Sequence, residues 1–320
     1  MQKFIRIILF IIILVLLIPA IWIGPYSLKV QHFQAAPANG FQTDFYLYVS
    51  PKAEQLAEAG EIVTILVQPN NSGTNSDDSK VHQRDAWMTG FERKEIADEL
   101  GVVLLVPAFI RPGEDWQIYT HALDRDTLTT MRPDLLRIDL QLIAMIDHAR
   151  IQLADNGIST DEKILIQGFS ASAMFANRFT ILHPDIVKAA AIGSPGGWPI
   201  APISGFDDQE LPYPAGIADL EELTGVPFDA AAYNAIPQLI YMGSLDANDS
   251  LDFEDGWEQE NAKVVNQLFG SDPLTRWKEA EALYQEEGAN VRFLLIEGIG
   301  HDRKELQSYA TEFFKDILNR

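Results

Sequence analysis

The stretch GFSAS, residues 168–172, contains a serine in the setting of a catalytic nucleophile. An apolar strand pattern precedes it and a run of small residues follows, which is the strand–turn–helix context of the nucleophile pattern G-x-S-x-G. Ser172 stands where that pattern has its second glycine, but serine is also small, as a tight turn requires. The pattern therefore predicts Ser170 as a nucleophile on a strained turn.

A serine hydroxyl is a weak nucleophile and needs a base, which is usually a histidine. The chain has six histidines. His301 follows the last predicted strand at its carboxyl end, where a parallel sheet places its functional sites. The other five lie near the N-terminus, within or at the end of predicted helices, or in polar segments before Ser170. Elimination therefore predicts His301 as the base.

The imidazole in turn needs a carboxylate that holds its tautomer and stabilises the imidazolium. Asp246 is the first carboxylate after the predicted strand 238–242, so we predict it as the acid and keep Asp249 in reserve. The same loop alternates oxygen-bearing residues as a calcium loop does. Leu251, however, occupies the position where such a loop requires glycine. We expect neither a metal ion nor a cofactor.

Apolar strands alternate with amphipathic helices along the rest of the chain, which predicts a three-layer α/β fold with a mostly parallel sheet and helices on both faces. We expect an antiparallel edge strand at 41–49 and buried strands at 62–67, 102–106, 164–166, 189–192, 238–242 and 291–296. We expect helices at 132–156, 173–182, 275–287 and 303–318.

The order Ser170, Asp246, His301, in the motifs GFSAS, GSLD and GIGH, resembles the α/β-hydrolase superfamily over residues 41–320. Within it, GFSASAMFANRF followed by VKAAAIGSPGGWP most resembles secreted polyhydroxybutyrate-depolymerase-like and feruloyl-esterase-like hydrolases. The resemblance implies the α/β-hydrolase fold. It also implies a serine hydrolase that cleaves small or polymeric carboxylic esters through an acyl-enzyme intermediate.

The resemblance further implies an oxyanion hole, in which the backbone N–H of Ala171 is one donor by position. The second donor is expected after the strand 62–67, where related enzymes often carry a His-Gly pair. This chain has Pro69-Asn70-Asn71 there, and proline has no N–H. Asn70 or Asn71 is therefore expected to donate through its backbone or its side chain, and the choice between them is open.

Residues 198–237 interrupt the alternation of strands and helices with a segment rich in proline, glycine, aspartate and aromatic residues. A segment this long between two strands is typical of a lid or a binding loop. We expect a lid-like insertion here, and a substrate pocket lined by Trp116, Tyr119 and Trp198.

The N-terminus carries an uncharged apolar run, residues 7–23, preceded by Lys3 and Arg6. This pattern is typical of a signal peptide or a short signal-anchor helix and predicts export of the chain that follows. We expect a membrane anchor at 1–24, or secretion after its cleavage, then a linker at 25–40 and the catalytic domain at 41–320.

Composition narrows the choice of partners. A net charge of −22 repels phosphate groups, so we expect no nucleic acid partner. The chain has no cysteine, which excludes a thiolate nucleophile and disulfides.

A peptidase or an acyltransferase would use the same triad, and a catalytically inactive membrane-anchored binding module could share the fold. The substrate and the oligomeric state stay open.

Overall fold

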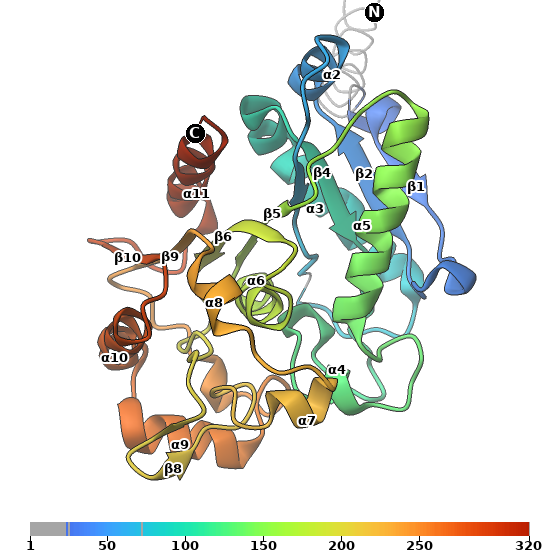
Figure 1. Ribbon diagram of the computed structural model, residues 1–320. Helices are drawn as coiled ribbons and strands as arrows, with labels where there is room; N and C mark the ends of the chain where they lie inside the picture. The colour runs from blue at the N-terminus through green and yellow to red at the C-terminus, as the bar shows by residue number, and fades with distance from the viewer. Residues whose placement is uncertain (1–23, 25, 72, 320) are drawn as a thin grey trace, which may run out of the picture.

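The computed structural model describes residues 24, 26–71 and 73–319 (Figure 1). Within them an eight-stranded sheet has the order β1-β2-β4-β3-β5-β6-β9-β10. Its strands are β1 Gln31–Phe33, β2 Phe45–Val49, β3 Ile65–Val67, β4 Val103–Pro107, β5 Ile164–Phe169, β6 Val187–Gly193, β9 Gln238–Gly243 and β10 Val291–Ile296. Strand β2 is antiparallel to both β1 and β4, and every other pairing in the sheet is parallel.

Helices and short elements connect these strands. Besides a helical turn at 26–29, the α-helices in the described residues are α2 Pro51–Glu58, α3 Ser79–Leu100, α4 Asp126–Thr129, α5 Ile138–Asp155, α6 Ala171–Leu182, α7 Leu220–Thr224, α8 Ala230–Asn234, α9 Gln259–Phe269, α10 Pro273–Glu286 and α11 Arg303–Leu318. Three 3-10 turns lie at η1 Pro37–Asn39, η2 Thr120–Ala122 and η3 Ser250–Asp252, and a small hairpin pairs β7 Gly205–Phe206 with β8 Gln209–Glu210.

Side chains of the strands alternate between the two faces of the sheet. Apolar side chains on each face pack against a layer of helices. On one face, Ile164 and Ile166 of β5 join a core that includes residues of α5, α6 and α10. On the other face, Leu165 and Phe169 join a core built with α3 and α11. The three-layer α/β fold with a mostly parallel sheet is therefore confirmed (Figure 1).

Several predicted elements match the structure closely and others differ. The strand 291–296 and the helix 303–318 have the predicted bounds. The expectation that 291–296 is buried is wrong, because β10 is an edge strand in which only Ile296 is buried. The prediction of an edge strand at 41–49 is wrong, because β2 lies between β1 and β4 and all five of its residues are buried. Helices α3 and α9 were not predicted. Seven residues of α3 are buried, but they include His82, Gly90 and Arg93, so its apolar periodicity is weak.

Residues 26–40 of the segment 25–40, which was expected to be a linker, instead belong to the folded unit. It supplies the edge strand β1, which pairs with β2. Tyr26 is 1% exposed, and its ring centroid lies 5.2–5.8 Å from those of Tyr48, Trp87 and Phe91. The expected membrane anchor at 1–24 lies outside the described residues except for Gly24. Among the helices that are described, none is long and apolar enough to span a bilayer.

Residues 198–237, expected to be a lid-like insertion, contain the β7–β8 hairpin and helices α7 and α8. Part of this segment joins a third hydrophobic cluster together with α9 and the start of α6. Its buried members include Ala171, Met174, Trp198, Leu211, Ala215, Leu251, Trp257 and Val265. The segment is therefore anchored by its own packed core.

We predict that Tyr26→Ala lowers the free energy of unfolding by about 3–5 kcal/mol, because it empties a site among three aromatic rings. Leu28 is the matched control, since it lies in the same helical turn and is 88% exposed. Leu28→Ala should change the free energy of unfolding by less than about 0.5 kcal/mol. Denaturant unfolding followed by tryptophan fluorescence measures both, and equal effects would show that residues 26–40 are not part of the fold.

Candidate active site

Ser170 lies on a sharp turn between β5 and α6. Its backbone angles are φ 61° and ψ −128°, a conformation that residues other than glycine rarely adopt. The backbone N–H of Ser170 donates to the carbonyl of Gly193 on β6 over 2.9 Å. A Cβ on Gly168 would lie 2.0 Å from the carbonyl oxygen of Ser172, so only glycine fits at that position. The close turn therefore presents Ser170 at the carboxyl end of the sheet.

Ser172 has a specific role in this turn. Its hydroxyl accepts a hydrogen bond from the Phe169 N–H over 3.0 Å and donates to the Phe169 carbonyl over 2.9 Å. The side chain is buried, so these bonds form away from competing water. The serine that replaces the pattern's second glycine therefore fastens the first turn of α6 to the end of β5.

Asp246 and His301 are brought together by loops that follow neighbouring parallel strands. Asp246 lies three residues after β9, and His301 lies five residues after β10. The loops are in contact, since the Leu245 N–H donates to the Ile299 carbonyl over 2.9 Å. A Cβ on Gly243 would lie 2.1 Å from that same carbonyl oxygen, so glycine is required where they cross. His301 Nδ1 lies 2.8 Å from Asp246 Oδ2.

The surroundings of Asp246 keep it ionised. Burial opposes its negative charge, but hydrogen bonds from His301 and from the Asn248 N–H outweigh burial and hold the pKa of this carboxyl below its ordinary value. Asp249, the reserve acid, forms an ion pair with Arg276 instead. Asp246 is therefore the carboxylate that can orient His301, and Nδ1 is the ring nitrogen that faces it.

Ser170 and His301 line the same cavity, which has a volume of about 300 Å³. The cavity is lined by Gln68, Pro69, Asn71, Thr89, Glu92, Arg93, Phe169, Ser170, Ser172, His301 and Arg303. The residues from α3 and α11 were not foreseen from the sequence. Because α3 was not predicted, nothing in the residue pattern connected Thr89, Glu92 or Arg93 with Ser170.

The two candidate asparagines of the oxyanion loop have different surroundings. Asn71 lines the cavity, and its Nδ2 lies 3.5 Å from the Phe169 carbonyl. Asn70 is fully buried below it, where its side chain accepts from the Phe109 N–H over 3.1 Å and donates to the Phe109 carbonyl over 3.0 Å. His121 Nε2 lies 3.1 Å from Asn70 Nδ2, and burial lowers the pKa of His121 to about 3. The Asn70 side chain therefore holds the loop in place, and Asn71 is the asparagine that can reach a ligand.

The aromatic residues expected in the substrate pocket lie elsewhere. Trp198 is buried against Phe269, with ring centroids 4.5 Å apart. Tyr119 lies under Arg111, whose Cζ is 3.9 Å from the ring centroid. Neither these two nor Trp116 is among the described residues that line the Ser170 cavity. None of residues 198–237, all of which the structure describes, lines it either, so a lid over Ser170 is not confirmed.

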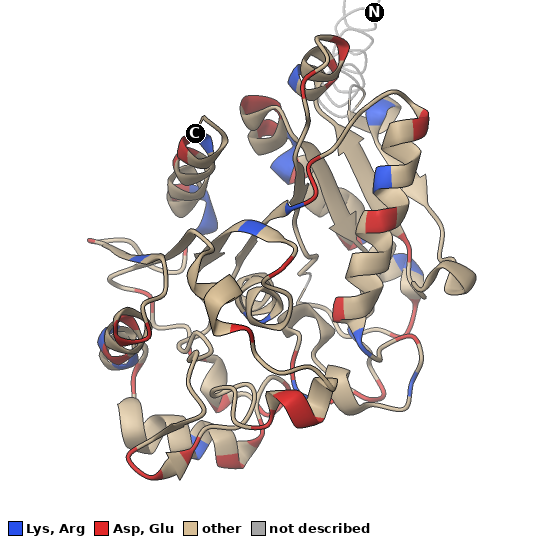
Figure 2. Ribbon diagram, in the orientation of Figure 1, with Lys and Arg blue, Asp and Glu red and all other residues tan. Residues whose placement is uncertain are grey.

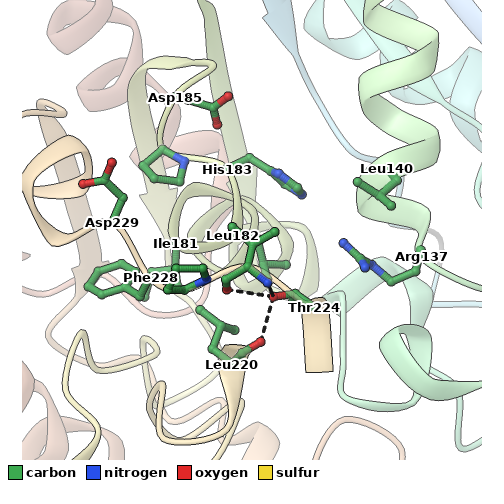
Figure 3. Close-up of a pocket in the computed structure, with 13 residues that line it drawn as sticks. Arg137, Leu140, Ile181, Leu182, His183, Asp185, Leu220, Thr224, Phe228 and Asp229 are labelled. Atoms are coloured by element: carbon green, nitrogen blue, oxygen red, sulfur yellow. Dashed lines mark hydrogen bonds between the residues drawn. The ribbon is translucent and has the colours of Figure 1, made fainter. Parts of the chain in front are cut away.

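A larger cavity of about 430 Å³ lies apart from Ser170, between α5, the end of α6 and the α7–α8 segment (Figure 3). It contains His183, whose Nε2 is 2.8 Å from Oδ2 of the buried Asp139. The Thr224 hydroxyl there lies within hydrogen-bond distance of the Leu220 and Val226 carbonyls. Of the described residues that line this cavity, none is a serine, so its histidine–aspartate pair has no comparable nucleophile.

No protein-family model matches the chain, and no curated protein matches its sequence. Solved structures do resemble it. Poly(aspartic acid) hydrolase-1 from Sphingomonas sp. KT-1 has a TM-score of 0.56 at 20% identity, over 89% of this chain and 97% of that one. A poly(3-hydroxybutyrate) depolymerase from Bordetella parapertussis has a TM-score of 0.51 at 17% identity, over 85% and 83%. An S-formylglutathione hydrolase from Agrobacterium tumefaciens has a TM-score of 0.50 at 17% identity, over 91% and 94%.

The TM-scores show that the chain shares its fold with these structures. At identities this low a shared fold does not show a shared activity, which has to be argued from the residues of the site. The mostly parallel sheet with helices on both faces matches the fold of these neighbours. The chain has the α/β-hydrolase fold, as its resemblance to that superfamily implied.

We predict that Ser172→Gly, which would complete the G-x-S-x-G pattern, destabilises the protein. It removes two buried hydrogen bonds and adds a glycine to a helix, which together cost about 2 kcal/mol. Ser308→Gly is the matched control, because Ser308 lies exposed within α11 and tests only the helix propensity, at about 0.5 kcal/mol. Denaturant unfolding gives both values. Equal losses would mean that the Ser172 hydroxyl does not fasten the turn.

Proposed function

We propose that this protein is a serine hydrolase that cleaves carboxylic esters through an acyl-enzyme intermediate. The observation that carries the proposal is the pairing of His301 with Asp246 over 2.8 Å at the same cavity as the strained Ser170. Nucleophile, base and orienting acid are the three groups that acyl transfer by a serine needs. Poly(3-hydroxybutyrate) depolymerase and S-formylglutathione hydrolase, among the structural neighbours, support the same class of reaction.

The reaction begins when the Ser170 oxygen attacks the acyl carbonyl. Nε2 of His301 takes the hydroxyl proton, and the Asp246 carboxylate stabilises the resulting imidazolium through Nδ1–H. The tetrahedral oxyanion accepts hydrogen bonds from the N–H of Ala171 and from Asn71, each contributing about 3–4 kcal/mol to the stability of the transition state. Ala171 is the first residue of α6, so its N–H has no partner within the helix.

Hydrolysis is then completed in two stages, acylation of Ser170 with release of the alcohol and deacylation by water. His301 returns its proton to the departing alcohol, and the C–O bond to that alcohol cleaves, which leaves the acyl group on Ser170. Water enters, gives a proton to His301 and attacks the acyl carbonyl. Collapse of the second tetrahedral intermediate releases the carboxylic acid and restores the Ser170 hydroxyl.

We predict that Ser170→Ala and Asp246→Asn each lower kcat for ester hydrolysis by about 10⁴-fold or more, because one lacks the nucleophile and the other loses the correct imidazole tautomer. Asp252→Asn is the matched control, since Asp252 is exposed in the same loop and should retain wild-type kcat. A panel of nitrophenyl esters from acetate to palmitate, a feruloyl ester, a polyester film and a peptide nitroanilide gives the rates. Equal rates for wild type and Ser170→Ala would contradict the proposal, and a preference for the nitroanilide would make the enzyme a peptidase.

We propose in addition that the N-terminal segment carries the catalytic domain out of the cytoplasm, either anchored in the membrane or released after cleavage. The support is the apolar run 7–23 after Lys3 and Arg6. In fractionated cells the protein should be found with membranes or in the medium, and intact cells should lose it to external protease. Recovery in the cytosol would contradict this proposal.

A further inference from the structure

The cavity that holds Ser170 contains a buried cation without an anionic partner. Arg93, on α3, is 7% exposed. Its Nε donates to Gln68 Oε1 over 3.1 Å, and its Nη1 donates to Gln307 Oε1 over 2.6 Å. Both acceptors are neutral amides. Across the part of the chain that the structure describes, no carboxylate forms an ion pair with Arg93, and its Nη2 has no protein acceptor.

The other charged groups of the cavity do not neutralise Arg93. Arg303 and Glu92 pair with each other, with Arg303 Nη2 2.5 Å from Glu92 Oε2. Burial lowers the pKa of Arg93 to about 10, the nearby Arg303 adds to this effect and Glu92 opposes it without contacting Arg93, and the guanidinium is still charged at neutral pH. The lining of the cavity that contains Ser170 therefore carries one positive charge without an ion-pair partner.

This local charge is opposite in sign to that of the molecule. The chain has a net charge of −22, and acidic residues are spread over the helices and loops around the sheet (Figure 2). A cation could find a carboxylate partner readily on such a protein. Arg93 instead occupies the buried face of α3, beside the core positions Gly90 and Ala97. Charged side chains are almost never buried unless they are paired, because removal from water disfavours the charge.

A buried guanidinium that faces a cavity can obtain its missing partner from a ligand. Its planar set of N–H donors matches the two oxygens of a carboxylate, and the burial of Arg93 strengthens that contact. Gln68 and Gln307 fix the orientation of Arg93 through two hydrogen bonds and leave Nη2 unbonded to protein. The site is thus arranged in advance for one anionic group close to Ser170.

We propose that the substrate carries a carboxylate and that Arg93 binds it while Ser170 attacks the ester carbonyl. This inference rests on the proposed function. It names the substrate class as half-esters of dicarboxylic acids and other esters with a carboxylate near the scissile bond. Arg93 is then a residue that determines specificity and takes no part in proton transfer.

The experiment compares kcat/KM for matched esters. One pair places the carboxylate in the acyl group, 4-nitrophenyl hemiadipate against 4-nitrophenyl methyl adipate. A second pair places it in the alcohol, 3-carboxy-4-nitrophenyl butyrate against 4-nitrophenyl butyrate. Wild type should favour the charged member of at least one pair by about tenfold to a hundredfold, the usual effect of a charge-assisted hydrogen bond. The preference should fall as salt is added.

The Arg93 variants test the assignment. Arg93→Met should abolish the charged-over-neutral ratio, and Arg93→Lys should restore part of it. Arg84→Met is the matched control, because it removes one positive charge from an exposed position of the same helix and should keep the wild-type ratio. A merely structural role of Arg93 would lower both rates and leave their ratio unchanged, which would overturn the inference.

If Arg93→Met does not fold, the kcat/KM values of the wild-type protein alone test the inference. Equal kcat/KM for the charged and neutral members of both pairs, in wild type at low salt, would overturn it. Ser170-dependent hydrolysis of the neutral esters would in that case still support the proposed function. Failure of a neutral fluorophosphonate to label folded wild-type protein would instead count against the proposed function itself.

Discussion

Ser170 has a backbone conformation that L-residues rarely adopt. Contacts from the surrounding strands and helix hold it in that conformation. The parallel neighbours β5 and β6 hold the turn through the bond from the Ser170 N–H to Gly193. Gly168 allows the chain to fold back on itself, and the Ser172 hydroxyl fastens α6 to β5. A strained residue persists only when its surroundings over-determine it, and it then often lies at a functional site. The strained turn is therefore the feature that the rest of the site depends on.

The parallel sheet explains how distant residues meet at this turn. The loops after β3, β5, β9 and β10 all leave the sheet at the carboxyl ends of parallel strands, so Asn71, Ser170, Asp246 and His301 lie at one edge. The helices α3 and α11, which cover one face, extend to the same edge and add Arg93 and Arg303 to the cavity. The loops after the parallel strands thus supply the candidate catalytic groups, and the two helices supply charged side chains that line the same cavity.

The sequence predicted the parts of the molecule that depend on local pattern. The bounds of strand β10, an apolar run, and of helix α11, an amphipathic pattern, were both predicted to the residue. Ser170, Asp246 and His301 could be predicted as a set because strand ends and chain order can be read from sequence, and the structure places His301 against Asp246 and in the same cavity as Ser170. The structure pairs Asp249 with Arg276, a choice that rests on packing between distant segments and that no local pattern reveals.

Other features depend on tertiary contacts and could not be predicted. Helix α3 buries His82, Gly90 and Arg93 on its inner face, so its pattern is too polar to indicate a buried helix, and its share of the cavity was missed with it. Aromatic residue type does not distinguish a pocket wall from a core, which is why Trp198 was misplaced. The three aromatic partners of Tyr26 lie on β2 and α3, far from it in the sequence. No local pattern reveals these contacts, and Tyr26 was therefore assigned to a linker.

Covalent labelling measures whether Ser170 is an activated nucleophile. Wild-type protein incubated with a neutral fluorophosphonate and digested should give one modified peptide, with the added mass on Ser170. Asp246→Asn should react far more slowly, since His301 then loses the carboxylate that orients it. Labelling at another serine, or no labelling of a protein whose circular dichroism shows it folded, would mean that Ser170 is not an activated nucleophile.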